Sequence, residues 1–566
     1  MWELCDFKEC VMMKLENIPV SNASMELADC RDKWFFDEKY DCWCLEDVLY
    51  SPKADMPAFQ RLSVYAPKAY MNDDGTVNET GACCGYTART APVLFETNAA
   101  GYMQMPHKWL GGPRCDGEKY VHRGMIYVTA GCRGRESRNE SGEPIGKAPI
   151  TLIDTKMAVR FLRHNRAALP GDWDKVISCG VSAGGAMSTL LGVTGDHPDY
   201  DACLREAGAF MDESDAMFAS QIYCPIIDLE HADLAYEWCF GADVECEDSP
   251  AGPAETMTPF KAALSKKLAA RYIDYVNGLG LKHPVTGAAL TLNPDGRGGG
   301  FYDYLMSLLG ESATKFLKIK DAGAADYISG NYTYEAPAKP PKDENPDMHH
   351  VGPGAGGGTE KRLTVGEMML RPPKGTPFHE MKLPMEQRQG TDKRAWLNWD
   401  GERAEISDLD TYVLNHRRRM KPCTSFDKLL SDSGENDVFG DVEHDFRHFD
   451  AQIGDAIAEL AGDYPDEAAK LLPGYREIAG DEALSERIRI FNPMNYIDDT
   501  EGRKAKHFRV RVGASDADTA FTVSMTLALR LQNTGNDVDY ALVWDQPHCD
   551  ADYPGEALDW IDSICK

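Results

Sequence analysis

The chain has 566 residues, of which 43% are hydrophobic and 27% charged, a composition typical of folded globular proteins and not of disordered ones. Its length exceeds that of one ordinary domain, so we expect two or three units, or one core that carries a large insertion. The formal net charge of -31 repels phosphate backbones and anionic lipid headgroups, which argues against nucleic acid or a membrane surface as a partner.

The N-terminal segment, residues 1–25, lacks the basic start and apolar core of a secretory signal. No stretch of the chain has the length and apolar character of a membrane span. The seventeen cysteines follow neither a disulfide framework nor the repeated C-x-x-C spacing of a zinc site. We therefore expect a cytoplasmic protein with reduced thiols and no metal.

Strands and helices alternate in the first part of the chain. Short apolar runs bounded by turn-forming residues predict strands at 61–67, 92–98, 124–131 and 175–180. Helices are predicted over 150–168, which ends before a Pro-Gly pair, and from Gly184 onward. This alternation favours a parallel sheet that is covered on both faces.

The alternation stops after a further predicted strand at 220–226. From there the sequence reads as helical segments and irregular loops, so we expect an insertion over 229–489 into a core made of 1–228 and 490–566. Within the insertion, residues 336–362 are rich in proline, glycine and charge, which predicts a mobile loop.

The core pattern resumes near the C-terminus. Strands are predicted at 507–513 and 538–545, and helices at 519–532 and 554–564. Arg509 and Arg511 alternate with apolar residues in the first of these strands, so that strand is expected near an edge of the sheet and not at its centre.

A G-x-S-x-G pentapeptide, Gly180 to Gly184, stands between a predicted strand and a predicted helix. In this motif a sharp turn strains the central serine and exposes its hydroxyl, and the flanking glycines avoid clashes. A glycine- and serine-rich loop is the alternative interpretation, but the strand-to-helix context favours a nucleophile. We interpret Ser182 as the nucleophile of an α/β-hydrolase core, a mostly parallel sheet with helices on both faces, that carries a large, mainly helical cap insertion.

A serine hydroxyl is a weak nucleophile until a base takes its proton, and in this fold an acid and then a histidine follow the C-terminal strands. Asp516 comes just after the strand at 507–513, and His548 comes after the strand at 538–545. Asp518 and Asp545 compete for the role of the acid, although Asp518 is also a natural cap for the next helix. Strand-end position favours Asp516 as the acid and His548 as the general base.

The oxyanion hole of such a site uses two backbone N–H groups. One is expected from Ala183, the residue after the nucleophile. The second is expected from the loop after the strand at 92–98, where Ala100 and Gly101 are equally suitable donors.

Several segments together resemble the bacterial tannases, esterases that cleave galloyl esters. They are GVSAGGAMSTLLGVTG (180–195), CPIIDLEHADLAYEW (224–238), RMKPCTSFD (419–427), SGENDVFG (433–440), GASDAD (513–518) and DQPHCD (545–550). The resemblance covers both halves of the predicted core and part of the insertion. It implies that Ser182, Asp516 and His548 occupy the triad positions of that family.

The same resemblance puts Lys421, Glu435 and Asp518 on the three residues that hold the hydroxyls of the galloyl ring. Two carboxylates accept hydrogen bonds from phenolic O–H groups, and a lysine donates one to a phenolic oxygen. A site built in this way should reject esters that lack the hydroxyls, because its own polar groups would be left unpaired.

The resemblance thus implies a serine carboxylic-ester hydrolase that cleaves galloyl (gallic acid) esters, acts on a small aromatic substrate and needs no metal or organic cofactor. An esterase for feruloyl, hydroxycinnamoyl or other small aromatic acids is the nearest alternative. A catalytically silent hydrolase fold used for binding is a more distant one. Fungal tannases and feruloyl esterases are less similar, since they place cysteine immediately before the nucleophile, where this chain has Val181.

Overall fold

The structure is a computed structural model that describes residues 26–112, 115–246, 255–329 and 394–566. The loop expected at 336–362 lies outside the described residues. Within them, no helix combines the length and the apolar character that a membrane span requires. The fifteen cysteines of the described part are all free thiols.

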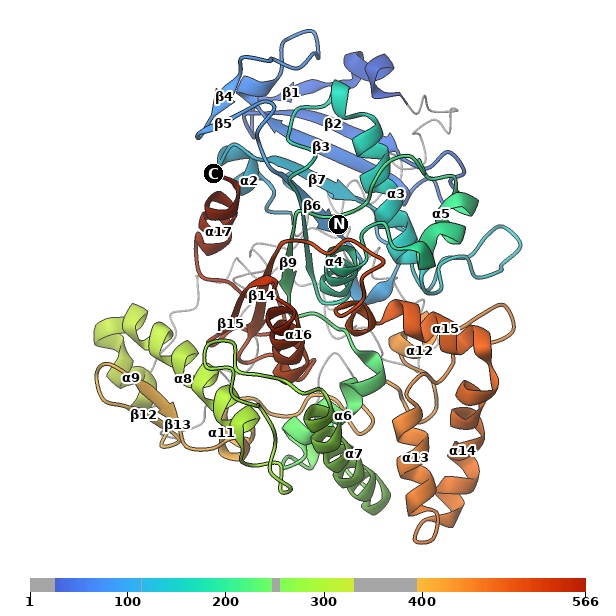
Figure 1. The fold of residues 1–566 in the computed structure, drawn as a ribbon, viewed down its shortest axis with the longest axis vertical. Helices are drawn as coiled ribbons and strands as arrows, with labels where there is room; N and C mark the ends of the chain where they lie inside the picture. Colours follow the sequence, from blue (N-terminus) through green and yellow to red (C-terminus); the bar gives the residue numbers. More distant parts are fainter. Residues whose placement is uncertain (1–25, 113–114, 247–254, 330–393) are drawn as a thin grey trace, which may run out of the picture.

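A nine-stranded sheet runs through the described part of the core, in the order β1-β2-β3-β7-β6-β8-β9-β14-β15 (Figure 1). Strands β1 to β3 and β7 pair antiparallel, and every pairing from β7 through β6 to β15 is parallel. The strands are β1 (Phe35–Asp37), β2 (Cys42–Leu49), β3 (Arg61–Pro67), β6 (Val93–Thr97), β7 (Ile126–Ala130), β8 (Val176–Val181), β9 (Ala219–Tyr223), β14 (His507–Gly513) and β15 (Asp537–Val543).

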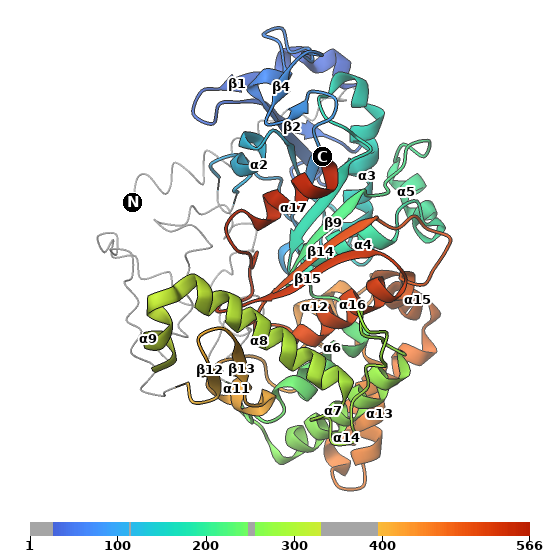
Figure 2. The same cartoon turned by 60° about the vertical axis from the view of Figure 1, so that its left-hand side comes forward.

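Helices cover both faces of this sheet, as the alternation in the sequence predicts (Figures 1 and 2). One face carries α2 (Glu118–His122) and α17 (Glu556–Cys565), which are joined by the Arg123–Asp562 ion pair. The other face carries α3 (Ile150–His164), α4 (Ala183–Val193) and α16 (Phe521–Asn533), with α5 (Asp201–Ala207) packed outside α3. The mostly parallel, two-sided sheet confirms the predicted fold class.

Two N-terminal strands, β1 and β2, extend the sheet beyond the predicted strands. The sequence CWCLEDVL of β2 shows no regular alternation, because its first four residues are all buried and its last four are half-buried. The strand is fixed by long-range pairing with β3, where Trp43 opposes Ala66 and Leu45 opposes Val64. Sequence periodicity therefore misses β1 and β2, which only their neighbours stabilise.

Strand β14 is next to the edge strand β15, which confirms the position expected from its two arginines. The guanidinium of Arg509 is 0% exposed and forms an ion pair with Asp552 over 2.6 Å. Arg511 pairs with Asp539 over 2.6 Å. The arginines are therefore tolerated in the sheet because each charge meets a carboxylate close to the sheet edge.

The described parts of 229–489, residues 229–246, 255–329 and 394–489, fold mainly as helices. These helices gather at the end of the molecule opposite β1 to β5 (Figures 1 and 2). Strands β4 (Ala82–Cys83) and β5 (Tyr86–Thr87) form a small hairpin. Two short two-stranded sheets, which periodicity did not predict, interrupt the helices: β10 (Glu245–Cys246) with β11 (Glu255–Thr256), and β12 (Leu397–Trp399) with β13 (Ala404–Ile406). The described helices are α6 (Leu229–Phe240), α7 (Pro259–Gly278), α8 (Gly300–Lys320), α9 (Ala324–Ser329), α11 (Leu409–Asn415), α12 (Gly434–Val438), α13 (Ala451–Leu460), α14 (Pro465–Gly480) and α15 (Glu482–Phe491).

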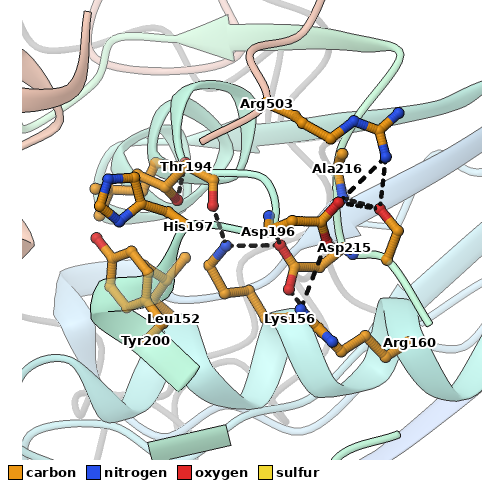
Figure 3. A network of polar contacts seen from close by, with 12 residues as sticks. Leu152, Lys156, Arg160, Thr194, Asp196, His197, Tyr200, Asp215, Ala216 and Arg503 are labelled. Carbon is orange, nitrogen blue, oxygen red and sulfur yellow. Dashed lines mark hydrogen bonds and ion pairs between the residues drawn. The ribbon is translucent and has the colours of Figure 1, made fainter. Parts of the chain in front are cut away.

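A buried network of charges joins α3 to the end of α4 and to the segment between α5 and β9 (Figure 3). Lys156 Nζ donates to the carbonyl of Thr194 over 2.6 Å and to Asp215 Oδ1 over 2.7 Å. Arg160 Nε donates to the other oxygen of Asp215 over 2.7 Å. The side chains of Lys156 and Asp215 are both 0% exposed, so their pairing offsets the loss of hydration. The network fixes the far end of α4, the helix that begins just after Ser182.

Candidate active site

Ser182 stands at the turn between β8 and α4, in a conformation that side chains rarely adopt. Its φ is 62° and its ψ is -125°, and it is the N-cap residue of α4. Such a strained residue costs about 1 to 3 kcal/mol and persists only where its surroundings hold it. Here its N–H donates to the carbonyl of Tyr223 over 3.1 Å, at the end of the neighbouring strand β9.

The glycines of the motif are required by the close approach of β6. A Cβ on Gly180 would lie 2.2 Å from Thr97 Oγ1 and 2.3 Å from the carbonyl oxygen of Gly184. A Cβ on Gly184 would lie 2.6 Å from the carbonyl oxygen of Thr97. The Thr97 hydroxyl donates to the Gly184 carbonyl over 2.7 Å. No side chain larger than hydrogen fits at either position, which is the physical reason for the G-x-S-x-G pattern.

The structure brings Asp516 and His548 together. His548 Nδ1 and Asp516 Oδ2 are 2.8 Å apart, and the Asp516 side chain is 0% exposed. The loops that carry them are joined by a hydrogen bond from the Ser515 N–H to the Gln546 carbonyl. Ser182 lies at the carboxyl end of β8 in the same parallel part of the sheet, with β9 between β8 and β14. The three side chains thus come from neighbouring strand ends.

The opposite charges of Asp516 and His548 shift the pKa of both groups. Burial lowers the pKa of His548, but the carboxylates of Asp516 and Asp518 outweigh it and hold that pKa well above the ordinary value. Burial raises the pKa of Asp516, whereas the charge and hydrogen bond of His548 bring it below the usual range. Asp518 does not cap the next helix, because the N-cap residue of α16 is Ala520. The backbone N–H of Asp518 donates to Asp516 Oδ1 over 2.8 Å.

Cys224 is a neighbour of this pair that the sequence analysis did not single out. It directly follows β9 and is fully buried, and its Sγ accepts a hydrogen bond from the Gly513 N–H over 3.5 Å. Burial, followed by the charge of Asp516, raises the pKa of this thiol to about 12. Its position after a strand that ends at the same edge was the only available sequence signal.

The expected oxyanion loop packs against the helix that starts after the nucleophile. Ala100 and Gly101 lie in the 3-10 turn η3 (Ala100–Tyr102), which contacts α4, and Ala183 is the first residue of α4. The turn is fastened at two points: Arg135 Nε donates to the Gly101 carbonyl over 2.9 Å, and the Tyr102 hydroxyl donates to the carbonyl of Ile226 over 2.5 Å. The choice between Ala100 and Gly101 as donor stays a prediction.

Lys421 is held through its backbone. Its N–H donates to the hydroxyl of Tyr236 on α6 over 3.1 Å, and its carbonyl accepts from Arg419 Nε over 2.7 Å. Arg419 is itself fixed by a buried two-point ion pair with Glu237, also on α6. The Lys421 ammonium lies 4.1 Å from the centre of the Phe426 ring.

Glu435 lies on α12, whose start is stabilised by a capping box between Ser433 and Asn436. Arg135, which also holds Gly101, donates to Asp437 Oδ2 on α12 over 2.6 Å. Helix α12 accordingly packs against η3. Burial and the charge of Glu435 raise the pKa of the Tyr102 hydroxyl, so the Glu435 carboxylate lies close to the oxyanion loop.

Among the described residues, the side-chain charges of Lys421, Glu435 and Asp518 have no hydrogen bond or ion pair with the protein. By contrast, Arg419 and Asp437, each two residues away along the chain, form ion pairs with Glu237 and Arg135. The sequence analysis missed Lys428, which is half-buried nearby; burial and the charge of Lys421 lower its pKa. The charges of Lys421 and Glu435 both act on the Lys428 ammonium, so these three groups lie near one another.

A mostly parallel sheet with a strained serine after β8 and a buried carboxylate–imidazole pair after β14 and β15 defines an α/β-hydrolase. The family model described as BD-FAE matches residues 141–228, the segment that contains the serine turn.

Solved structures of tannases match nearly the whole chain. A tannin acyl hydrolase in complex with ethyl gallate is 30% identical, with 93% of this chain and 94% of that chain covered and a TM-score of 0.69. The native tannin acyl hydrolase from Lactobacillus plantarum is 29% identical, with 93% and 94% covered and a TM-score of 0.70. The tannase of Fusobacterium nucleatum is 27% identical, with 93% and 95% covered and a TM-score of 0.69. The comparison with curated proteins gives no match. The chain belongs to the tannase family and is an esterase.

Proposed function

We propose that the protein hydrolyses galloyl esters through an acyl-enzyme formed on Ser182. The observation that carries this proposal is the set of unpaired polar side chains, Lys421, Glu435 and Asp518, of which Asp518 lies in the same loop as Asp516. The similar tannin acyl hydrolase whose structure contains ethyl gallate supports the choice of substrate.

The chemistry proceeds in two steps. Ser182 attacks the ester carbonyl while His548 takes its proton, and His548 then gives that proton to the departing alcohol. Water repeats the sequence on the acyl-enzyme and releases the acid. Asp516 orients the imidazole and stabilises its cationic form, in keeping with the raised pKa of His548. The N–H of Ala183 and that of Ala100 or Gly101 stabilise the oxyanion.

The galloyl ring is recognised through its hydroxyls. Glu435 and Asp518 accept hydrogen bonds from phenolic O–H groups, and the ammonium of Lys421 donates to a phenolic oxygen. An ester without these hydroxyls leaves the three charges unpaired in a partly desolvated site, which costs binding in the transition state. The substrate acid is therefore a small ring that bears adjacent hydroxyls.

The two parts of the chain divide this work. We assign the chemistry to the core, residues 1–228 and 490–566, and the acyl pocket to the cap, residues 229–489. Lys421 and Glu435 come from the cap, and the contact of α12 with η3 brings the cap against the oxyanion loop. We further propose that the protein works in the cytoplasm on a small-molecule ester.

The test is hydrolysis of methyl gallate, methyl ferulate and methyl benzoate by the wild-type protein and by Ser182→Ala. We expect a strong preference for methyl gallate and no activity in the alanine variant. Equal rates on the three esters would support a hydrolase without a galloyl-specific pocket. A preference for methyl ferulate would favour a hydroxycinnamoyl esterase. If no ester reacts and a fluorophosphonate probe does not label Ser182, the fold serves for binding only.

Glu435→Gln and Lys421→Met refine this test. Each variant removes one charge that contacts the ring hydroxyls but none that contacts the ester. We expect the rate on methyl gallate to fall by about tenfold to a hundredfold, because a lost hydrogen bond to a charged group is worth about 1.5 to 3 kcal/mol. The rate on methyl benzoate should stay within about twofold of the wild-type rate, given that benzoate makes none of these bonds.

A further inference from the structure

Cys224, Asp516 and His548 form a compact group of three different ligand types. The Cys224 sulfur, a ring nitrogen of His548 and a carboxylate oxygen of Asp516 all lie within 4.8 Å of one another. Thiolate, imidazole and carboxylate are the groups that bind Zn²⁺ in proteins, and thiolate favours soft ions such as Cd²⁺ as well. Within the described residues this is the one group of such side chains close enough to share an ion.

We propose that Cys224, His548 and Asp516 bind a soft divalent ion, Zn²⁺ or Cd²⁺, and that the bound ion inhibits the enzyme. The binding does not depend on the proposed function, but the inhibition rests on it. Ligand atoms of one tetrahedral Zn²⁺ lie about 3.4 to 3.6 Å apart, given its bond lengths of about 2.0 to 2.3 Å. His548 Nδ1 and Asp516 Oδ2, which are 2.8 Å apart, therefore need to separate slightly, whereas the Cys224 sulfur, within 4.8 Å of its partners, needs to approach by little more than about 1 Å.

The surroundings favour this arrangement over an accidental cluster. The Cys224 thiol is fixed by the Gly513 N–H, and Asp516 is fixed by the Asp518 N–H, so two of the three ligands are held in place before an ion arrives. Cys224 and Asp516 are buried, whereas the His548 side chain is 18% exposed. An ion thus enters past the imidazole ring.

Ion binding replaces protons on the ligands with bonds to the metal. The ion forms a bond to the Cys224 sulfur, and the thiol proton passes to the solvent buffer. The ion also binds Nδ1 of His548 and one oxygen of Asp516, and the proton that Nδ1 shares with Asp516 moves to Nε2 or, from the doubly protonated ring, to the buffer, so that Nε2 keeps a proton. His548 then no longer accepts the proton of Ser182, so the first step of ester cleavage stops, and a chelator that removes the ion restores it.

The binding test uses Cd²⁺ titration, followed by the ultraviolet absorbance of the cadmium–thiolate bond. The surface pair Cys83 and Cys84, whose sulfurs are 3.5 Å apart, would bind the same ions. The parent protein and both variants in this titration therefore carry serine at positions 83 and 84. Cys224→Ser is compared with Cys549→Ser, a matched buried cysteine next to His548 that is outside the group. We expect Cys224→Ser to lose one cadmium–thiolate signal that Cys549→Ser retains.

The inhibition test measures ester hydrolysis and fluorophosphonate labelling of Ser182 at increasing Zn²⁺ or Cd²⁺, each normalised to the ion-free rate of the same variant. We expect Cys224→Ser to raise the half-inhibiting concentration at least tenfold, Cys549→Ser to leave it unchanged, Mg²⁺ to have no effect and EDTA to reverse the loss. Equal inhibition of the Cys224 variant and its parent would overturn the proposal. So would a zinc absorption-edge spectrum of the one-to-one zinc complex without a sulfur ligand, a readout that needs no Cys224 variant. Cys224-dependent cadmium binding by a protein that hydrolyses no ester would instead disprove the proposed function and keep the metal site.

Discussion

Tyr236 on α6 links the loop that carries Asp516 to the loop that carries Lys421, the predicted ring-binding lysine. Its hydroxyl donates to the Ala517 carbonyl over 2.9 Å and accepts the N–H groups of Met420 over 3.2 Å and Lys421 over 3.1 Å. Ala517 stands between Asp516 and Asp518 in the chain. Replacing Tyr236 with phenylalanine removes only this junction, since the ring and its packing on Phe240 remain.

The expected cost follows from these bonds. Tyr236 is 0% exposed, so water does not replace the lost hydroxyl. Each buried polar group left without a partner costs about 1 to 3 kcal/mol, and the junction serves three groups, so Tyr236→Phe should lower the free energy of unfolding by about 3 kcal/mol or more. Freed from the phenol, Lys421 should also lose part of its alignment with the ring. A loss of about 1.4 kcal/mol there is a tenfold fall in the methyl gallate to methyl benzoate ratio of kcat/KM.

Urea unfolding and kcat/KM on both esters measure these two effects. The matched control is Tyr50→Phe, which removes one buried phenol hydrogen bond, to the carbonyl of Gly131, on the N-terminal side of the sheet. We expect the control to lose about 1 kcal/mol of stability with an unchanged ratio of the two esters. If Tyr236→Phe is destabilised but keeps the wild-type ratio, the hydroxyl supports the fold alone, and the argument that it aligns Lys421 is wrong.

Three further predictions concern other contacts of the core and site. Asp215→Asn leaves Lys156 and Arg160 without their buried counter-charge, so it should lower the free energy of unfolding by about 3 to 5 kcal/mol in urea titration; a change below about 1 kcal/mol would contradict the buried network. Asp518→Asn removes a negative charge that helps to raise the pKa of His548, and because the base acts in its neutral form, the acid limb of kcat/KM on methyl benzoate should move to lower pH. An unmoved limb would show that this charge does not reach the imidazole. Arg135→Met removes the hydrogen bonds from Arg135 to the oxyanion loop and to α12, so kcat should fall about tenfold or more on methyl gallate and methyl benzoate alike. A loss confined to methyl gallate would show that Arg135 acts on the ring pocket instead.

Most strands of the core could be predicted because each carries its own signal. Strands β3 and β14 match their predicted ranges, and β8 lies within a residue of its range, since buried apolar runs between turn residues are local features. The turn that carries Ser182 was predicted for the same reason, because G-x-S-x-G is a pattern of five neighbouring residues between a strand and a helix. The order of an acid and then a histidine after the last two strands added the other two residues.

The remaining features depend on segments that lie far apart in the sequence. Strand β2 has no periodicity of its own and is fixed by pairing with β3. Asp516 and Asp518 are two residues apart in one loop; strand-end position favours Asp516, and the fold sets its carboxylate oxygen 2.8 Å from His548. Cys224 meets the same pair only because β9 ends beside β14.

The sequence by itself determined the hydrolase core, the serine turn and the polar residues that resemble the ring-binding set, because strand patterns, tight turns and short motifs are written within a few neighbouring residues. The tertiary structure alone decided which cysteine lies beside the imidazole. It also decided that Tyr236 meets Met420, 184 residues along the chain, and that Arg135 meets Asp437, 302 residues along the chain. Those contacts arise from the order of strands in the sheet and from the packing of segments that are distant in the sequence, and no local pattern encodes either.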